Sequence, residues 1–230
     1  MALKLYELSG VDDNRFSPFC WRVRLALAHK GLDAETVPLT FGQKDKLTFS
    51  GQDRVPVLVD GDAIVSDSWQ IACYLEDAYP DRSSLFGGDI GRGEALFLNA
   101  WADTVVAGGI VPLVVRDILN CTEEVDKAYF RTSREARLGK ALEAVEAERD
   151  GRLPGFRSSL QPLRMVLEQQ PFVAGDGPAY ADYIFFGLFQ WARLTSPYAL
   201  LAADDPIYAW RDRMLGLFDG LASEAKGFPL

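Results

Sequence analysis

Hydrophobic and polar residues alternate with a period of two over residues 3–8, and this pattern predicts a β-strand. Ser17 and Pro18 then favour a helix start, because serine caps a helix N-terminus and proline loses no hydrogen bond in the first turn. Gly31 is typical of a helix end, and residues 34–39 predict a second strand. Because a helix connects the two strands, we expect them to be parallel.

The pattern then predicts a short helical patch over residues 43–49 and a strand over residues 54–60. Gly61 and Asp62 form a tight turn signal before a return strand at residues 63–65, which we expect to be antiparallel. A further helix is expected from Asp67 to about Tyr79, where Pro80 follows.

Strand signals stop after this point, and only helical periodicity follows. We therefore expect an α/β domain over residues 1–82, a linker over residues 83–88 and an all-helical domain over residues 89–230. The helices expected in the second domain cover residues 92–120, 123–150, 157–170, 180–194 and 206–223.

Composition narrows the possible functions. With 48% hydrophobic residues among 230, the chain can build a sizeable core, and its net charge of −9 argues against binding to nucleic acid or to an anionic membrane. We find no signal peptide and no apolar run near the ~18 residues that a membrane span needs. Three scattered cysteines and one histidine fit a reducing cytoplasm and give no metal-binding pattern.

The segment from Ser17 to Cys20, with sequence SPFC, has the form of a C-x-x-C redox motif whose first cysteine is a serine. Without that first thiol, Cys20 cannot run a dithiol cycle within the motif. A single-thiol role and a buried, inert thiol both remain open for Cys20. The Ser17 hydroxyl at a helix start can either stabilise a thiolate or simply cap the helix.

His29 is the only histidine of the chain. It follows Ser17 by twelve residues on the same expected helix, which is a distance of ~18 Å at ~1.5 Å per residue. It therefore cannot act as a general base for Ser17, and we expect a structural role.

Four motifs together resemble the soluble glutathione transferases and are spread over the whole chain: Ser17-Pro18-Phe19, Val55-Pro56, Asp67-Ser68 and Asp182. The resemblance implies a thioredoxin-like α/β domain of order βαβ-α-ββα followed by a helical-bundle domain. It also implies glutathione as co-substrate, a small and aromatic electrophile as second substrate, and a homodimer.

Some stretches are similar to the glutathione-dependent β-etherase subgroup, whose members cleave aryl ethers of lignin-derived compounds. In such a reaction the glutathione thiolate attacks the carbon that bears the ether oxygen, and a phenolate leaves. General detoxifying conjugation, thiol transfer through Cys20 and non-catalytic ligand binding are the alternatives. The stretches are residues 17–22, 54–57, 67–69, 150–154 and 217–221.

The resemblance gives these motifs roles in binding glutathione. Ser17 holds the thiolate and is not itself the nucleophile. Val55, before a cis-proline at Pro56, pairs through its backbone with the cysteinyl part, and Asp67 and Ser68 hold the γ-glutamyl end. From the residues alone, an ordinary edge-strand proline is the alternative for Pro56, and plain helix capping fits Asp67 and Ser68 equally well.

Gln43 and Lys44 lie where the family often contacts the glycyl carboxylate, although a solvated helix start fits them as well. We expect the electrophile pocket between the two domains, against the first helix and the long helices. Its candidate residues are Phe16, Phe19, Trp101, Thr104 and Val105.

Asp182 resembles the buried aspartate of the family's helix-capping box, so we expect it to act in folding. The usual serine or threonine three residues earlier is Ala179 in this chain. The missing reciprocal hydrogen bond corresponds to about 1 kcal/mol of helix stability.

Overall fold

The N-terminal part of the chain forms a four-stranded mixed sheet in the order β2-β1-β3-β4. This computed structural model describes residues 3–228. The two strands joined by a helix are parallel, with Leu3 opposite Ala34, and the later two are antiparallel additions. The predicted α/β order is therefore confirmed. The strands are β1 (Leu3–Leu8), β2 (Ala34–Leu39), β3 (Val57–Asp60) and β4 (Ala63–Ser66).

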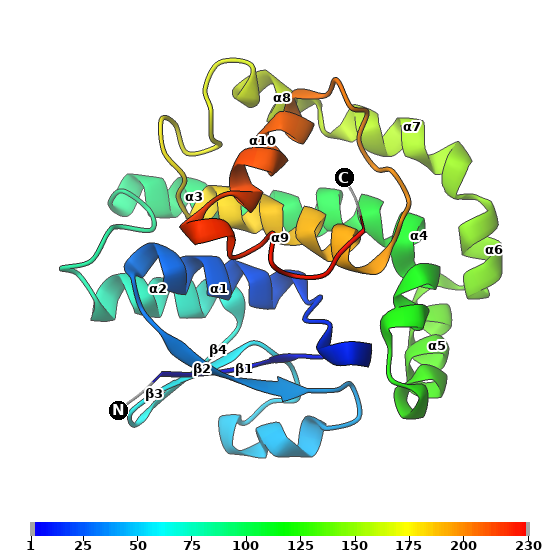
Figure 1. Ribbon diagram of the computed structural model, residues 1–230, viewed down its shortest axis with the longest axis horizontal. Coiled ribbons are helices and arrows are strands. Elements are labelled where there is room, and N and C mark those ends of the chain that lie inside the picture. Colours follow the sequence, from blue (N-terminus) through cyan, green and yellow to red (C-terminus); the bar gives the residue numbers. More distant parts are fainter. Residues whose placement is uncertain (1–2, 229–230) are drawn as a thin grey trace.

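Two helices, α1 (Pro18–Lys30) and α2 (Ser68–Ala78), lie between the sheet and the helical part of the molecule (Figure 1). The start of α1 is fixed as the sequence predicts, because the Cys20 amide donates to Ser17 Oγ at 3.3 Å. Its end is fixed by Gly31, which adopts the left-handed conformation with φ of 62°. Short 3₁₀ turns η1 (Val11–Asp13) and η2 (Lys44–Ser50) complete this part.

The remainder of the described chain is helical, as expected, but several of its helices are shorter than predicted. The segment expected as one helix over 123–150 breaks at Gly139, whose φ of 69° ends α5. The segment expected as one helix over 157–170 breaks at Leu160, one residue before α8 begins. The helices are α3 (Asp89–Trp101), α4 (Ala107–Ile118), α5 (Glu124–Leu138), α6 (Leu142–Ala147), α7 (Arg149–Ser159), α8 (Gln161–Leu167), α9 (Tyr180–Thr195) and α10 (Pro206–Leu215), with turns η4 (Leu119–Cys121) and η5 (Phe218–Gly220).

A π-helical turn, η3 (Ala102–Val106), joins α3 to α4. The helical run from Asp89 to Cys121 is long and apolar enough to span a membrane by length and composition, contrary to the sequence-based expectation. The run packs against α6, α7 and α9. Only 33% of its most apolar window is buried, so this packing accounts for part of its apolar character.

Helix α9 is the central element that joins the two parts. It packs along α1, α3 and α4, and nearly all of its side chains are buried. Gly187 allows the closest approach, because a Cβ there would lie 2.5 Å from the Pro18 carbonyl oxygen. The start of α1, and with it Ser17, is thus held against the helical part.

Asp182 is fully buried in the first turn of α9. Its carboxylate accepts hydrogen bonds from the amides of Val173, Ala174 and Ala179 and from the indole of Trp210, at 2.7 to 3.2 Å. These contacts join α9, α10 and the loop before α9. They support the folding role that the sequence suggests for this residue.

Candidate active site

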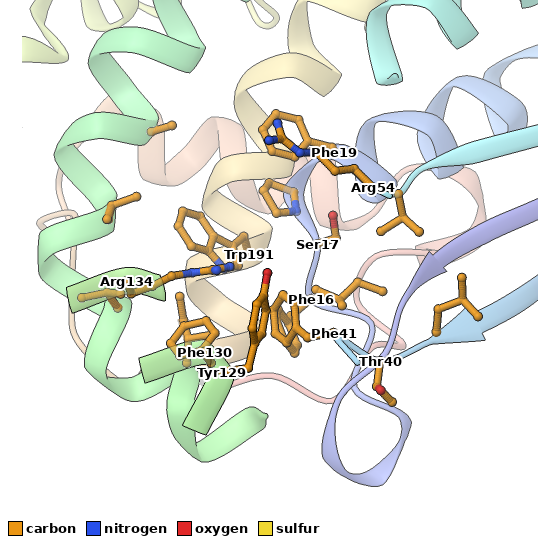
Figure 2. Close-up of a pocket in the computed structure, with 18 of the residues that line it drawn as sticks. Phe16, Ser17, Phe19, Thr40, Phe41, Arg54, Tyr129, Phe130, Arg134 and Trp191 are labelled. Carbon is orange, nitrogen blue, oxygen red and sulfur yellow. The ribbon is translucent and has the colours of Figure 1, made fainter. Parts of the chain in front are cut away.

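A cavity of about 500 Å³ lies between the α/β part and the helical part, and Ser17 lies on its wall (Figure 2). The cavity wall combines the loop before α1, the segments that follow β2 and precede β3, and helices α4, α5 and α9. Its size is typical of a pocket for a small ligand.

Ser17 is only 5% exposed, but it borders the cavity. Its oxygen accepts the Cys20 amide, so its hydroxyl proton can be donated to a second group. The N-terminus of α1 adds a favourable potential for an anion of about 0.3–1 kcal/mol. The geometry suits stabilisation of a thiolate in the cavity.

Cys20 is 2% exposed and does not line the cavity. Burial, assisted by the nearby negative charge of Glu7, raises the pKa of the Cys20 thiol to about 12. A thiol in this state is a poor nucleophile at neutral pH. The structure therefore favours the buried, inert interpretation of Cys20.

The residues expected to bind glutathione lie close together but differ in their relation to the cavity. Val55, whose peptide bond to Pro56 is cis, lines the cavity. The Asp67 amide donates to the Pro56 carbonyl at 3.3 Å, which places Asp67 and Ser68 next to that turn. The Asp67 carboxylate caps the start of α2, and Ser68 is 2% exposed. Neither residue lines the cavity.

Gln43 and Lys44 both line the cavity. Gln43 Oε1 accepts the Thr40 amide at 3.3 Å and so shapes the loop. Lys44 Nζ lies 2.9 Å from an Asp53 carboxylate oxygen and 5.2 Å from the centre of the Tyr129 ring. Hydrogen bonds to Tyr129 and Asp53 raise the pKa of Lys44.

Of the residues expected in the electrophile pocket, Phe16 and Phe19 line the cavity and three do not. The Trp101 ring packs on Phe185 instead, with ring centres 5.2 Å apart. Thr104 Oγ1 donates to the Ala100 carbonyl at 2.7 Å, and Val105 is 38% exposed.

The physical reason for this difference lies in the helical phase. Only one face of this helical run borders the cavity, and Trp101, Thr104 and Val105 lie on another face. The positions that face the cavity from this run follow a spacing of three or four residues: Asp103, Ala107, Val111, Val115 and Ile118.

Sequence reasoning missed the aromatic and cationic wall that α5, α9 and the loop after β2 contribute. Phe130 is 1% exposed, and its ring centre lies 5.5 Å from that of Phe41. The only sequence signal for this wall was an arginine, Arg134, close to aromatic residues on an expected helix. The same pattern is also typical of a solvent-exposed helix surface. The missed residues are Phe41, Tyr129, Phe130, Arg134 and Trp191 (Figure 2).

His29 lies near the opposite end of α1 from Ser17 and does not line the cavity. Its Nδ1 lies 2.6 Å from the Tyr183 hydroxyl, and burial lowers its pKa. Within residues 3–228, no group of three His, Cys, Asp or Glu side chains is arranged to hold a metal ion.

Comparison with known families gives two matches in chain order. Residues 13–83 match the N-terminal domain of glutathione S-transferase, and residues 94–203 match its C-terminal domain. Together the two matches cover more than three quarters of the chain.

Curated relatives are similar over part of the chain. A zeta-class glutathione S-transferase of Euphorbia esula is 37% identical over 124 residues, which is 51% of this chain and 50% of the relative. Glutathione S-transferase 1 of Dianthus caryophyllus is 35% identical over 53% of each chain. The matched segment thus spans about half the length of these relatives.

Solved structures are similar over nearly the whole chain. Glutathione transferase GSTFuA2 of Phanerochaete chrysosporium has a TM-score of 0.78 at 24% identity and covers 97% of this chain and 95% of its own. A glutathione S-transferase of Ceriporiopsis subvermispora, solved in complex with glutathione, has a TM-score of 0.81 at 20% identity and covers 100% and 99%. These two structures show a shared fold. Because the N-terminal and C-terminal domain models both match in chain order, the chain belongs to the glutathione S-transferase family.

Proposed function

We propose that this protein is a glutathione transferase that conjugates glutathione to a small aromatic electrophile. The observation that carries the proposal is the position of Ser17, whose hydroxyl lies at the N-terminus of α1 on the wall of a cavity lined with aromatic side chains. Family membership and the fold shared with a glutathione-bound transferase support it.

In this proposal the Ser17 hydroxyl donates a hydrogen bond to the sulfur of glutathione. A free thiol has a pKa near 8.5, so a donor and a helix N-terminus that stabilise the anion raise the thiolate fraction at neutral pH. The thiol proton passes to solvent. The thiolate then forms a carbon–sulfur bond with the electrophile, and the leaving group departs with its electron pair.

We place the peptide of glutathione along the turn that precedes β3. The Val55 backbone pairs with the cysteinyl part, in the manner of an added strand. The γ-glutamyl end lies near Asp67 and Ser68 at the start of α2, and Gln43 and Lys44 meet the glycyl carboxylate. The ammonium of Lys44, which borders the cavity, supports the last assignment.

The test compares wild type with Ser17→Ala for glutathione binding by calorimetry and for turnover of 1-chloro-2,4-dinitrobenzene. A hydrogen bond to a charged group contributes about 1.5–3 kcal/mol, so turnover should fall roughly 10- to 100-fold. Binding should change by less than about threefold, because the peptide contacts remain. Wild-type protein that binds no glutathione at millimolar concentration would refute the proposal.

Because Ser17 also caps α1, the variant needs a stability control. Loss of the cap should reduce stability by about 1 kcal/mol. Thermal melting of both proteins separates this effect from the loss of turnover. A rate loss that follows the unfolded fraction would identify Ser17 as a cap only.

Cleavage of β-aryl ethers is the narrower hypothesis. Of the five stretches similar to β-etherases, only residues 17–22 and 54–57 contribute to the cavity wall, and these include Ser17 and Val55, which we assign to glutathione. General conjugation is therefore the better supported function. Release of a fluorescent phenol from a model β-aryl ether, dependent on both glutathione and Ser17, would establish the narrower one.

We also propose that the protein is a cytoplasmic homodimer. Ile90 and Phe97 are 82% and 72% exposed, and they lie seven residues apart on α3, so they share a helix face. Two such apolar side chains on one face suit contact with a second copy of the chain. The free cysteines of the described chain fit a reducing compartment.

A further inference from the structure

The helical wall of the cavity holds a cation that no carboxylate of the described chain neutralises. Arg134, on α5, extends into the cavity beside Trp191, opposite Ser17 (Figure 2). Its guanidinium carbon lies 4.5 Å from the ring centre of Phe130 and 5.3 Å from that of Phe41. It donates to the Ser133 hydroxyl at 2.9 Å, which carries no charge.

The acidic groups of the cavity are already engaged elsewhere. Asp53 pairs with Lys44 at 2.9 Å and lies 3.9 Å from Arg54. Asp103 pairs with the fully buried Arg22 at 2.7 Å. Arg134 and Arg137, which lines the same cavity and has no carboxylate partner in the described chain, therefore leave an excess positive charge on a cavity wall in a protein whose net charge is −9.

A half-buried, unpaired cation is unfavourable for folding alone. Burial lowers the pKa of Arg134, because the charged guanidinium loses hydration there. Contacts with aromatic faces return part of that loss. A guanidinium that still faces an open cavity can recover the rest from a bound anion, and its planar donor pair matches a carboxylate.

We propose that Arg134 binds the carboxylate of an aromatic electrophile, and that this protein therefore prefers anionic aromatic substrates. The inference rests on the proposed function. The substrate ring would lie among Phe16, Phe41 and Tyr129, which line the same cavity. Its reactive carbon would then face the thiolate held by Ser17.

Two substrates that share one reaction test the proposal. In 4-chloro-3-nitrobenzoate and 4-chloro-3-nitrobenzamide, the glutathione thiolate forms a bond to the carbon bearing chlorine, and chloride leaves with the bonding electrons. The two compounds differ only in a carboxylate against a neutral amide. For each enzyme variant, kcat and KM are measured for both.

Arg134→Gln should lower kcat/KM for the benzoate at least tenfold, chiefly through KM, and change that for the benzamide by less than threefold. Arg134→Lys should recover part of the loss, because it keeps the charge but not the planar fork. Lys127→Gln is the matched control. It removes one positive charge from the same helix, outside the cavity wall, and should leave both substrates within twofold.

An equal fall for both substrates would overturn the proposal, because it would indicate a structural role for Arg134. A rise in KM for glutathione with an unchanged preference between the substrates would also overturn it. That result would assign Arg134 to a carboxylate of glutathione.

A binding measurement separates this inference from the proposed function. The fluorescence of the protein, which has Trp191 on the cavity wall, reports binding of the two glutathione conjugates made chemically from these substrates. Tighter binding of the carboxylate conjugate that is lost in Arg134→Gln supports the inference even if wild type turns over neither substrate. Equal binding of both conjugates by wild type would refute it.

Discussion

Replacing Glu7 with glutamine tests whether a buried charge holds the loop that carries Ser17. Glu7 lies in β1 and is fully buried. Its carboxylate accepts from Arg15 Nη1 at 2.5 Å and from Arg24 Nε and Nη2 at 2.8 and 2.6 Å. The Arg15 carbonyl in turn accepts the Trp21 indole at 2.7 Å, so the loop is tied to both β1 and α1.

The size of the effect follows from these contacts. Breaking a buried ion pair by removing one partner costs about 3–5 kcal/mol, because a buried charge remains without compensation. Arg15 keeps Asp13 at 2.6 Å, and the two arginine side chains are 14% and 20% exposed, so water recovers part of the loss. We therefore expect Glu7→Gln to lower the free energy of unfolding by about 3 kcal/mol, out of a typical total of about 5–15 kcal/mol.

Urea denaturation followed by tryptophan fluorescence measures this change. The midpoint should fall with an unchanged slope, since the same surface is exposed on unfolding. Glu35→Gln is the matched control. Its side chain is 58% exposed and only 3.4 Å from Lys4, so it should change stability by less than about 0.5 kcal/mol. A loss below about 1 kcal/mol for Glu7→Gln would refute the reasoning.

Four further changes test other parts of the structure. Ala179→Ser should stabilise the protein by about 0.5–1 kcal/mol in urea, because it supplies the missing cap of α9; no gain would contradict that interpretation. Phe97→Glu should leave a species near the chain mass of 25.5 kDa in light scattering, while an unchanged larger mass would exclude α3 from the dimer contact. Cys20→Ala should keep turnover within about twofold once normalised to folded protein, whereas loss of turnover would restore the thiol-transfer alternative. Burial lowers the pKa of His29 from 6.5, so the stability that its neutral ring provides is present above about pH 6.5 and is lost as the pH falls. In melting experiments between pH 5 and 7, His29→Gln should therefore lose less stability on acidification than wild type. An equal dependence of stability on pH in the two proteins would contradict this expectation.

Local signals explain why the sequence predicted the N-terminal elements well. The start of α1 needs only a cap at Ser17 and a proline, and its end needs only Gly31. The alternation over residues 3–8 is complete within one strand. Each of these signals acts between residues a few positions apart, so no knowledge of the rest of the fold is required.

The helical part shows where such signals fail. A single glycine inside a helical pattern is often tolerated, so Gly139 did not reveal that α5 ends there. Helical periodicity also does not reveal which face of the run from Asp89 to Ile118 borders the cavity, because that depends on packing against distant elements. The pocket residues expected on this run, such as Thr104, therefore missed the face that includes Asp103.

Charged residues in buried positions show what the sequence leaves open and what the structure adds. Alternation places Glu7 on the same face of β1 as Leu3 and Leu5, so a buried acid could be inferred, but not its partners Arg15 and Arg24. A buried charge needs compensation of opposite sign, whatever the source. For Glu7 the fold itself supplies that compensation, and the residue becomes part of the scaffold.

Arg134 presents the same physical requirement with a different outcome. The described chain offers its guanidinium aromatic faces and a hydroxyl, but no carboxylate, and the side chain borders a cavity. The compensation must then come from solvent or from a ligand, and a ligand that supplies it gains affinity because the desolvation of the cation has already occurred on folding. The paired buried charge thus marks the support of Ser17, and the unpaired one marks the place where the second substrate would be recognised.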